Sequence, residues 1–314
     1  MQNVRFKHGY PQILNALKSC EERKQHGAPS FGVAISYRFH KDDKCWRIFI
    51  SIPITKATPV TSSQKGVIGI DINANHLAIA ETDHFGNPIS KKSIPLNTYG
   101  KSTNQAKAIT GDVCTKLVEE AKTKGKHLVI ERLQFQKKKA ELKQQCSPKH
   151  ARMLSSLAYT QFKQNLTSKG WQEGVEVLEI NPAFTSVIGR VKFSKRYGLS
   201  IHQAAALTIG RRSLKVSERI PRHLEAIPDG KGGHVALSLP VRNRNKHVWS
   251  SWRILAQELK TVLAAHFRAR NRSSSSKPTS GYTPSRILPA ELRHVNRQHN
   301  CLVGVLDVPT AINV

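Results

Sequence analysis

A short apolar run that ends in an acid, residues 67–72, constrains the fold of this chain more than any other stretch. Val67, Ile68 and Ile70, with a glycine between them, are typical of a strand that is buried on both faces. Asp71 follows directly, and burying a carboxylate is costly unless a partner compensates its charge. A metal ion is one such partner. The plainer interpretation is an aspartate that caps the turn at the strand end, and both interpretations stay open at this point.

The order of elements around this run predicts an α/β domain. Strands are expected at 67–72, 76–81, 89–96, 127–131 and 175–180, and helices at 105–124, at 149–168 with Gly170 as its end, and from residue 200 onward. This order predicts an RNase H-like mixed sheet with flanking helices. Because neighbouring parallel strands end at one edge of a sheet, Asp71 and Glu131 are expected to converge there.

The regions on either side of this domain have a different character. A helix within residues 1–28 and a β-hairpin from strands 31–39 and 46–52 precede a Thr- and Ser-rich linker. An amphipathic basic helix within 245–272 and a flexible Ser-rich tail follow it. The sequence therefore predicts three parts: 1–65, a short β-rich N-terminal segment; 66–217, the RNase H-like domain; and 218–314, a basic helical C-terminal arm that stands apart from the core, with its tail.

The charge balance points to a polyanionic partner. The chain carries 50 Lys and Arg against 21 Asp and Glu, a formal net charge of +29. A membrane surface is the competing polyanion, but no run of about 18 apolar residues and no signal peptide is evident. A nucleic acid is therefore the expected partner, and no membrane is expected. The expected location is cytoplasmic and associated with the nucleoid.

The cysteines argue against a structural metal. The five cysteines are scattered, and no CxxC pair occurs among them. Free thiols are expected, with neither a disulfide framework nor a zinc ribbon.

Three stretches of the sequence have a recognisable pattern: GIDINANHLA at 69–78, LVIERL at 128–133 followed by Lys137, Lys138 and Lys139, and VEVLEINPAFTS at 175–186. In this order they resemble the RuvC blocks of the OrfB/TnpB-type transposon-encoded proteins, which are related to the type V CRISPR effector nucleases. The resemblance covers roughly residues 30–215. It implies a RuvC-like nuclease core, metal-dependent cleavage of DNA and guidance by a bound RNA.

The sequence departs from the family pattern at three places. Residues 187–199 fill the place of the family's zinc ribbon without a cysteine, so no zinc is expected. The region before residue 66 is short beside the family's wedge region, which puts the guide-binding apparatus in doubt. The third acid of the family lies in a pattern like Asp-x-x-Ala-Ala, and here His202 takes the Asp position.

His202 has two interpretations. A lone histidine at a helix start is most often an ordinary solvent-facing residue. Ser200 and Gln203, however, predict a capping box, which places His202 in the first helical turn, where the helix dipole disfavours its protonated form. A neutral imidazole can ligate a metal. The predicted catalytic and metal-binding set is therefore Asp71, Glu131 and His202, and Mg²⁺ or Mn²⁺ is the expected ion.

Two basic clusters accompany these acids. Phosphate contacts are predicted for Lys137, Lys138, Lys139, Arg190, Lys192, Lys195 and Arg196. A solvated, non-binding face is the alternative for each cluster.

The sequence thus favours a transposon-associated, RNA-guided DNA endonuclease that hydrolyses phosphodiesters with a divalent metal. Two alternatives remain at this point. One is a nucleic-acid-binding protein of the same family whose nuclease site is spent, and the other is a truncated remnant of a longer protein.

Overall fold

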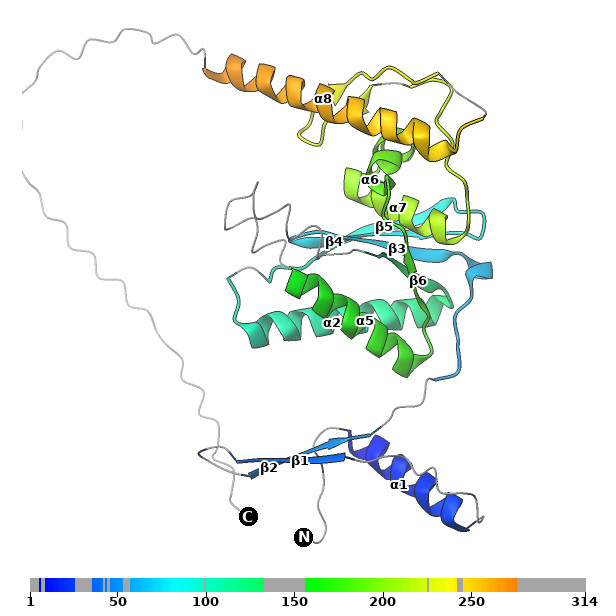
Figure 1. Ribbon diagram of the computed structural model, residues 1–314, viewed down its shortest axis with the longest axis vertical. Helices are drawn as coiled ribbons and strands as arrows, with labels where there is room; N and C mark the ends of the chain where they lie inside the picture. Colours follow the sequence, from blue (N-terminus) through cyan, green and yellow to red (C-terminus); the bar gives the residue numbers. More distant parts are fainter. Residues whose placement is uncertain are drawn as a thin grey trace, which may run out of the picture. The chain divides into compact units, whose positions relative to one another are not determined.

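The computed structural model describes residues 6, 9–25, 36–41, 43, 46–52, 57–98, 100–132, 156–224, 226–241 and 245–275 (Figure 1). The chain forms two compact units, Met1–Ala269 and Arg270–Val314. Of the second unit, only the helical residues up to Ser275 are described.

The N-terminal segment contains a helix and a hairpin, as predicted. Helix α1 spans Tyr10–Gln25. Strand β1 (Ser36–Lys41) pairs antiparallel with β2 (Trp46–Ser51). A 3-10 turn, η1 (Ser63–Lys65), then leads into the central sheet.

The central sheet has five strands in the order β5-β4-β3-β6-β7. Strands β3 (Val67–Ile72), β4 (His76–Thr82) and β5 (Pro88–Pro95) form an antiparallel meander. Strands β6 (His127–Glu131) and β7 (Val177–Ile180) continue the sheet in parallel with β3. This order, with its second strand antiparallel, confirms the predicted RNase H-like mixed sheet.

Helices cover both faces of this sheet (Figure 1). On one face lie α2 (Thr103–Lys124) and α5 (Ser156–Glu173). The other face carries α6 (Thr185–Ile188), a π-helix, η2 (Gly189–Ser194), and α7 (Ile201–Ser213).

The alternation of side chains along β3 and β6 divides the core between the two faces. Ile68 and Ile130 pack with Leu117 of α2 and Phe162 of α5. Val67, Val129 and Ile209 of α7 form the cluster on the opposite face. Both faces of these strands are therefore buried, as the apolar run predicted.

The end of α5 differs from the prediction. Gly170 lies inside the helix, and a Cβ at this position would come 2.7 Å from the backbone oxygen of Val175. The helix ends at Glu173, and Gly174 follows with a φ of +71°. Gly170 is thus a packing glycine and Gly174 is the stop.

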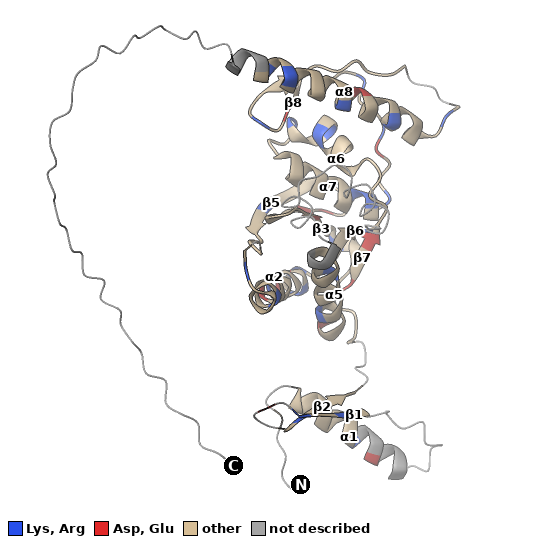
Figure 2. Cartoon of the chain, turned by 60° about the vertical axis from the view of Figure 1, so that its left-hand side comes forward, with Lys and Arg blue, Asp and Glu red and all other residues tan. Residues whose placement is uncertain are grey.

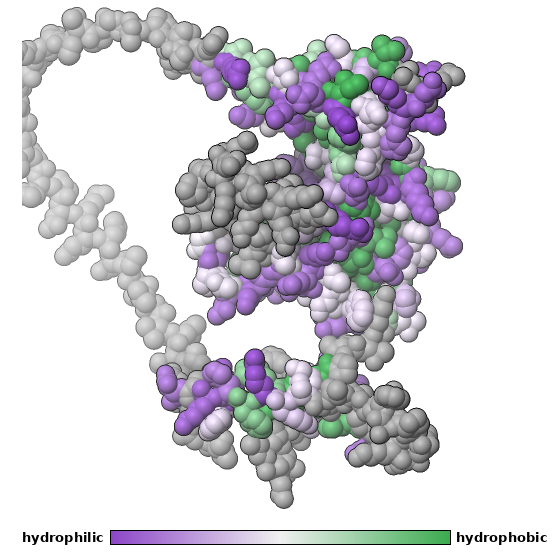
Figure 3. All heavy atoms as spheres, in the orientation of Figure 1, coloured by the Kyte–Doolittle hydropathy of each residue, from purple (hydrophilic) through white to green (hydrophobic). Residues whose placement is uncertain are grey.

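The basic C-terminal helix is present as α8 (Val248–Ser275), and Figure 2 shows Lys and Arg along it with little acid. Its apolar stripe is not free of the core, which corrects the expectation of a separate arm. Trp252, Leu255 and Leu259 are buried in one cluster with Leu207 of α7. In the space-filling view, hydrophilic and hydrophobic residues both reach the surface around α8 (Figure 3), and Ile254 of this helix is exposed. Burial of the apolar stripe therefore determines where α8 packs, in spite of the positive charge of the helix.

A small hairpin and an internal hydrogen bond complete this packing. Strands β8 (Ile227–Pro228) and β9 (His234–Val235) pair antiparallel, and both contribute a buried residue to the cluster under α8. The indole Nε1 of Trp252 donates to the backbone oxygen of Glu218 at 2.6 Å.

No helix among the described residues is long and apolar enough to cross a membrane.

An ionic cluster joins β4 to the end of α2 and the start of β6. The Glu81 carboxylate accepts hydrogen bonds from Lys124 and Lys126, each at 2.7 Å, and from Ser90 at 2.9 Å. Burial alone would raise the pKa of Glu81, but these donors together lower it to about 2 from an ordinary 4.5. The folded state therefore favours the ionised form of this carboxyl group.

We expect this cluster to make stability depend on acid pH. Because the folded pKa lies below the unfolded one, the stabilisation is complete above pH 4.5 and is lost as the pH falls toward 2. The loss is about 3–4 kcal/mol at about 1.4 kcal/mol per pKa unit. The Glu81→Gln variant leaves the buried Lys126 ammonium uncompensated, so we expect about 3 kcal/mol lower stability at neutral pH and a weaker acid dependence. Urea unfolding across pH measures both, with the exposed Glu119→Gln as control, and equal stability of the two variants would contradict the prediction.

Candidate active site

The register of the two central strands places two acids side by side. Strands β3 and β6 pair in parallel from Val67 opposite His127 to Gly69 opposite Val129. Continuing this register by two residues places Asp71 level with Glu131. Level residues on neighbouring parallel strands point to the same face, with backbones about 4.8 Å apart. Both acids therefore lie at one edge of the sheet, on the face that carries α7, as the sequence predicted.

Helix α7 approaches β3 closely because Gly69 has no side chain. A Cβ at Gly69 would lie 2.1 Å from the backbone oxygen of Ala206, which no real Cβ tolerates. His202 lies one helical turn before Ala206, toward the same sheet edge as Asp71. The predicted capping box at Ser200 and Gln203 is present and fixes the helix start.

This packing brings His202 onto Asp71. The imidazole Nδ1 of His202 lies 3.1 Å from Oδ2 of Asp71. The Asp71 side chain is 13% exposed and that of His202 is 49% exposed, so the pair sits at the surface end of a buried strand. His202 is thus exposed, as the solvent-facing interpretation expects, and its imidazole also contacts Asp71.

Two further polar residues belong to the Asp71 side of the site. The amide Nδ2 of Asn73 donates to Oδ2 of Asp71 at 3.0 Å. The ring of His76 packs edge-on against that of His202, with centroids 5.1 Å apart. Burial lowers the pKa of His76, the nearby His202 lowers it further, and Asp71 acts in the opposite direction.

Glu131 is held by the loop that follows β7. The hydroxyl of Thr185 donates to Oε1 of Glu131, and it also reaches the backbone oxygen of Pro182 at 3.0 Å. Phe184, with a φ of +62°, turns the chain so that Thr185 begins the short helix α6. The hydroxyl of Tyr159 donates to the backbone oxygen of Glu131 from α5. Hydrogen bonds from Thr185 and Tyr159 thus hold both the carboxylate and the backbone of Glu131 in place.

An arginine lies on the Glu131 side as well. Arg212, in the last turn of α7, is half-buried and donates to the backbone oxygen of Asn181. Burial lowers the pKa of its guanidinium, and the negative charges of Glu131 and Glu218 act in the opposite direction. The guanidinium carbon also lies 5.7 Å from the ring centroid of Trp249.

Sequence reasoning did not assign Thr185 or Arg212 to the site. Thr185 lies within the segment 181–186, whose resemblance to a family motif was a usable signal. Arg212 has no such signal, because an arginine in the last turn of a helix commonly stabilises the helix end.

The donor set suits a hard divalent cation in part. Two carboxylates on neighbouring strands offer oxygen ligands of the kind that Mg²⁺ and Mn²⁺ prefer. His202 contacts Asp71 directly. However, the described residues contain no group of three His, Cys, Asp or Glu side chains close enough together to hold one metal ion. The pair Asp71 and Glu131 fits the cation better than the full predicted triad does.

The predicted phosphate-binding residues differ in their settings. Lys137, Lys138 and Lys139 lie outside the described residues. Lys192 pairs with the buried Glu218, and Arg190 is half-buried near Asp229. Lys195 and Arg196 are exposed, with the Arg196 guanidinium 5.2 Å from the ring centroid of Tyr197. Of the second basic cluster, Lys195 and Arg196 are thus the two exposed cations.

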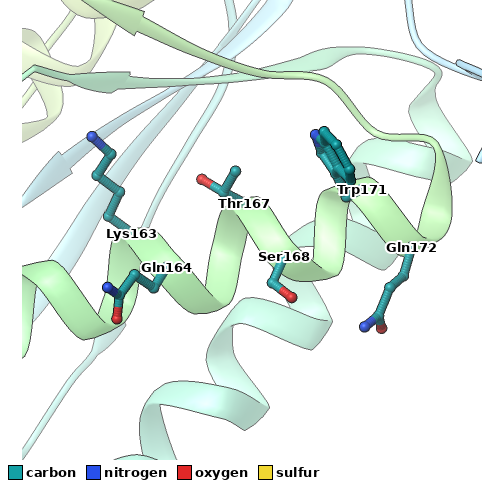
Figure 4. Close-up of a pocket in the computed structure, with 6 residues that line it drawn as sticks. All are labelled: Lys163, Gln164, Thr167, Ser168, Trp171 and Gln172. Atoms are coloured by element: carbon teal, nitrogen blue, oxygen red, sulfur yellow. The ribbon is translucent and has the colours of Figure 1, made fainter. Parts of the chain in front are cut away.

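A cavity of about 430 Å³ lies away from these acids, along α5 (Figure 4). Its described lining consists of two adjacent rows of that one helix: Lys163, Thr167 and Trp171, and Gln164, Ser168 and Gln172. A single cation and no acid line it, so it adds nothing to the acid pair.

Comparison with known proteins gives structural likenesses only. No family model matches the chain, and no curated protein matches its sequence significantly. RuvC from T. thermophilus, in complex with a Holliday junction substrate, is similar over 46% of this chain and 89% of its own, at 11% identity and a TM-score of 0.32. A CRISPR-Cas12f ternary complex (13% identity, TM-score 0.32) covers 62% of this chain and 48% of its own.

A Cas12f1–sgRNA–target DNA complex (14% identity, TM-score 0.32) covers 57% of this chain and 56% of its own. The chain therefore spans about half the length of the two Cas12f chains. At these identities the likeness concerns the fold, and the proposals below depend on this chain's own residues.

We expect the Gly69→Ala variant to disturb the site through packing. Its Cβ would force the α7 backbone away from β3, which costs about 1–3 kcal/mol and separates His202 from Asp71. The matched control is Gly111→Ala on α2, where a Cβ would meet nothing within 4 Å and where we expect a gain of up to about 1 kcal/mol. Denaturant unfolding compares the two, and a Gly69→Ala chain as stable as the wild type would contradict this account of the packing.

Proposed function

We propose that this chain is a metal-dependent DNA endonuclease with a RuvC-like core, of the OrfB/TnpB type, guided by a bound RNA. The observation that carries the proposal is the convergence at one sheet edge: Asp71 level with Glu131, and His202 in contact with Asp71. Partly buried acids brought together at a strand end are a typical place for functional groups.

In this proposal Asp71 and Glu131 hold Mg²⁺ or Mn²⁺, with His202 as a third, weaker ligand. The metal, when bound, supplies an activated water and stabilises the leaving oxygen of the phosphodiester. Asn73 and Thr185 orient the two carboxylates through the hydrogen bonds described above. His202 adds no negative charge, so we expect a higher metal requirement than three acids would give.

The charge of the chain supports a nucleic-acid substrate. The formal net charge is +29, and Lys195 and Arg196 present exposed cations on the chain that leads into α7. We include Lys137, Lys138 and Lys139 as phosphate contacts on sequence grounds. The transposon association and the guide RNA rest on the resemblance of the three sequence blocks.

A second candidate is a nucleic-acid-binding protein whose nuclease site is spent. One observation favours it: Oδ2 of Asp71 already has two partners, His202 and Asn73, at 3.1 and 3.0 Å. Internal donors can satisfy a carboxylate in place of a cation. Such a protein would bind DNA or RNA and block it without cutting.

Cleavage assays on the purified chain, with any RNA that co-purifies, separate the two candidates. For the nuclease, we expect cleavage of plasmid DNA in Mg²⁺ or Mn²⁺. The Asp71→Asn variant should cut at least about 100-fold more slowly, while its DNA affinity stays unchanged. Mutating a residue that merely orients a metal ligand can already lower activity by up to about 100-fold, and Asp71 is a ligand itself in this proposal. The His202→Asp variant restores a negative charge and should cut at lower Mg²⁺ than the wild type.

The matched control is Asp112→Asn, the same change at an exposed acid on α2, which should cut like the wild type. Tight DNA binding without cleavage in either metal, by the wild type and with its RNA retained, would refute the nuclease and support the binding protein. Removal of the co-purified RNA should abolish specific cleavage, and RNA-independent cleavage would refute the guided mechanism alone.

A further inference from the structure

A second cavity, of about 680 Å³, lies at the start of α8. Its lining comes from three stretches of chain: Ser217 with residues 219–222, residues 239–240, and residues 246–248 with Ser251 at the beginning of the helix. Its volume lies in the range of about 300–1,000 Å³ that is usual for small-molecule and cofactor sites.

Within the described residues, the cations of this cavity have no acidic partner. Arg219, Arg222 and Lys246 line it, no Asp or Glu is among its described lining residues, and none of the three takes part in an ion pair within the described chain. Nearby cations behave differently: Lys192 and Arg211 both pair with the buried Glu218. Three like charges around one hollow repel one another, so the cavity favours an anion that neutralises them.

The remaining lining is mixed: Ser217, His247 and Ser251 are polar, and the other residues form an apolar part. Ile220, Leu239 and Pro240 line the same hollow, and Ile220 also packs against the core cluster under α8. A ligand that suits both parts has a flat apolar group and an attached polyanionic group. A nucleotide has this composition, with a base for the apolar wall and a phosphate for the cations.

The cavity is also linked to the candidate active site. Val248 lines it, and the next residue, Trp249, contacts two elements of that site. Its ring lies 6.2 Å from that of Phe184, which precedes the Thr185 that holds Glu131, and 5.7 Å from the Arg212 guanidinium. A strand seated in the cavity would therefore begin beside the elements that position Glu131.

We propose that this cavity binds one unpaired nucleotide of a single strand, with its base on Ile220, Leu239 and Pro240 and its phosphates on Arg219, Arg222 and Lys246. The proposal rests on nucleic acid as the partner in the proposed function, and not on cleavage. Single-stranded RNA and single-stranded DNA share this chemistry.

Binding of short fluorescent oligonucleotides by the Asp71→Asn chain tests the proposal without cleavage. The test variant carries Arg219→Ala, Arg222→Ala and Lys246→Ala. The control variant removes the same charge from exposed lysines of the α2 region by Lys101→Ala, Lys107→Ala and Lys116→Ala. Thermal unfolding of both variants checks that they fold as their parent does. RNA and DNA strands of one sequence, run in parallel, tell the two sources apart.

We expect the test variant to bind the single strand at least about 10-fold more weakly than the control variant. The slope of log affinity against log salt should fall by about 1.4, at about 0.7 for each of the two phosphates that flank the nucleotide. A strand with abasic sites should bind the parent more weakly than an intact strand, and this difference should vanish in the test variant. Polyglutamate should fail to displace the strand.

Equal losses in the two variants, equal binding of abasic strands, or displacement by polyglutamate would each overturn the proposal. If the parent binds no nucleic acid at all, the proposed function fails with it. If the parent binds nucleic acid and both variants bind equally, only the nucleotide site fails.

Discussion

The close contact of α7 with β3 at Gly69 is the constraint on which the candidate active site depends. The missing Cβ lets the backbone at Ala206 approach the strand, and the helix residues Ala204, Ala205 and Ala206 are all buried. A larger side chain at Gly69 would lift the helix off the sheet. The same approach carries His202, one turn earlier, to within 3.1 Å of Asp71. Gly69 thus determines both how closely α7 packs on β3 and how closely His202 approaches Asp71.

The second acid is organised from the other side. Glu131 takes a hydrogen bond from Thr185, in the loop after β7. The neighbouring Phe184 contacts Trp249 of α8, which also lies against Arg212 of α7. The C-terminal helix is therefore connected to the Glu131 side of the site, and its buried stripe holds that connection in place. A ligand that shifts the start of α8 would act on the loop that orients Glu131.

Local sequence patterns predicted the strands of the sheet and the acids at their ends. The partners of the basic residues and the packing of α8 depend on contacts between distant stretches, which the sequence could not show. The run from Val67 to Ile70 and the capping box at Ser200 depend on neighbours in sequence, so they were readable. The pairing of Lys192 with Glu218, the hydrogen bond from Thr185 to Glu131 and the burial of Trp252 join distant stretches. A basic residue or an amphipathic stripe looks the same in sequence whether it faces a phosphate or a buried acid.

The central proposal is that Asp71 and Glu131 hold a cation beside His202, and histidine NMR in the presence of Mn²⁺ tests it most directly. A bound Mn²⁺ broadens the signals of nearby nuclei. The account predicts that the ring signals of His202 and His76 broaden first, at low Mn²⁺, and that Asp71→Asn abolishes this effect. His127, at the start of β6 and the opposite end of that strand from Glu131, is the internal reference. Equal broadening of His202 and His127, or broadening of His202 that persists in Asp71→Asn, would contradict the claim.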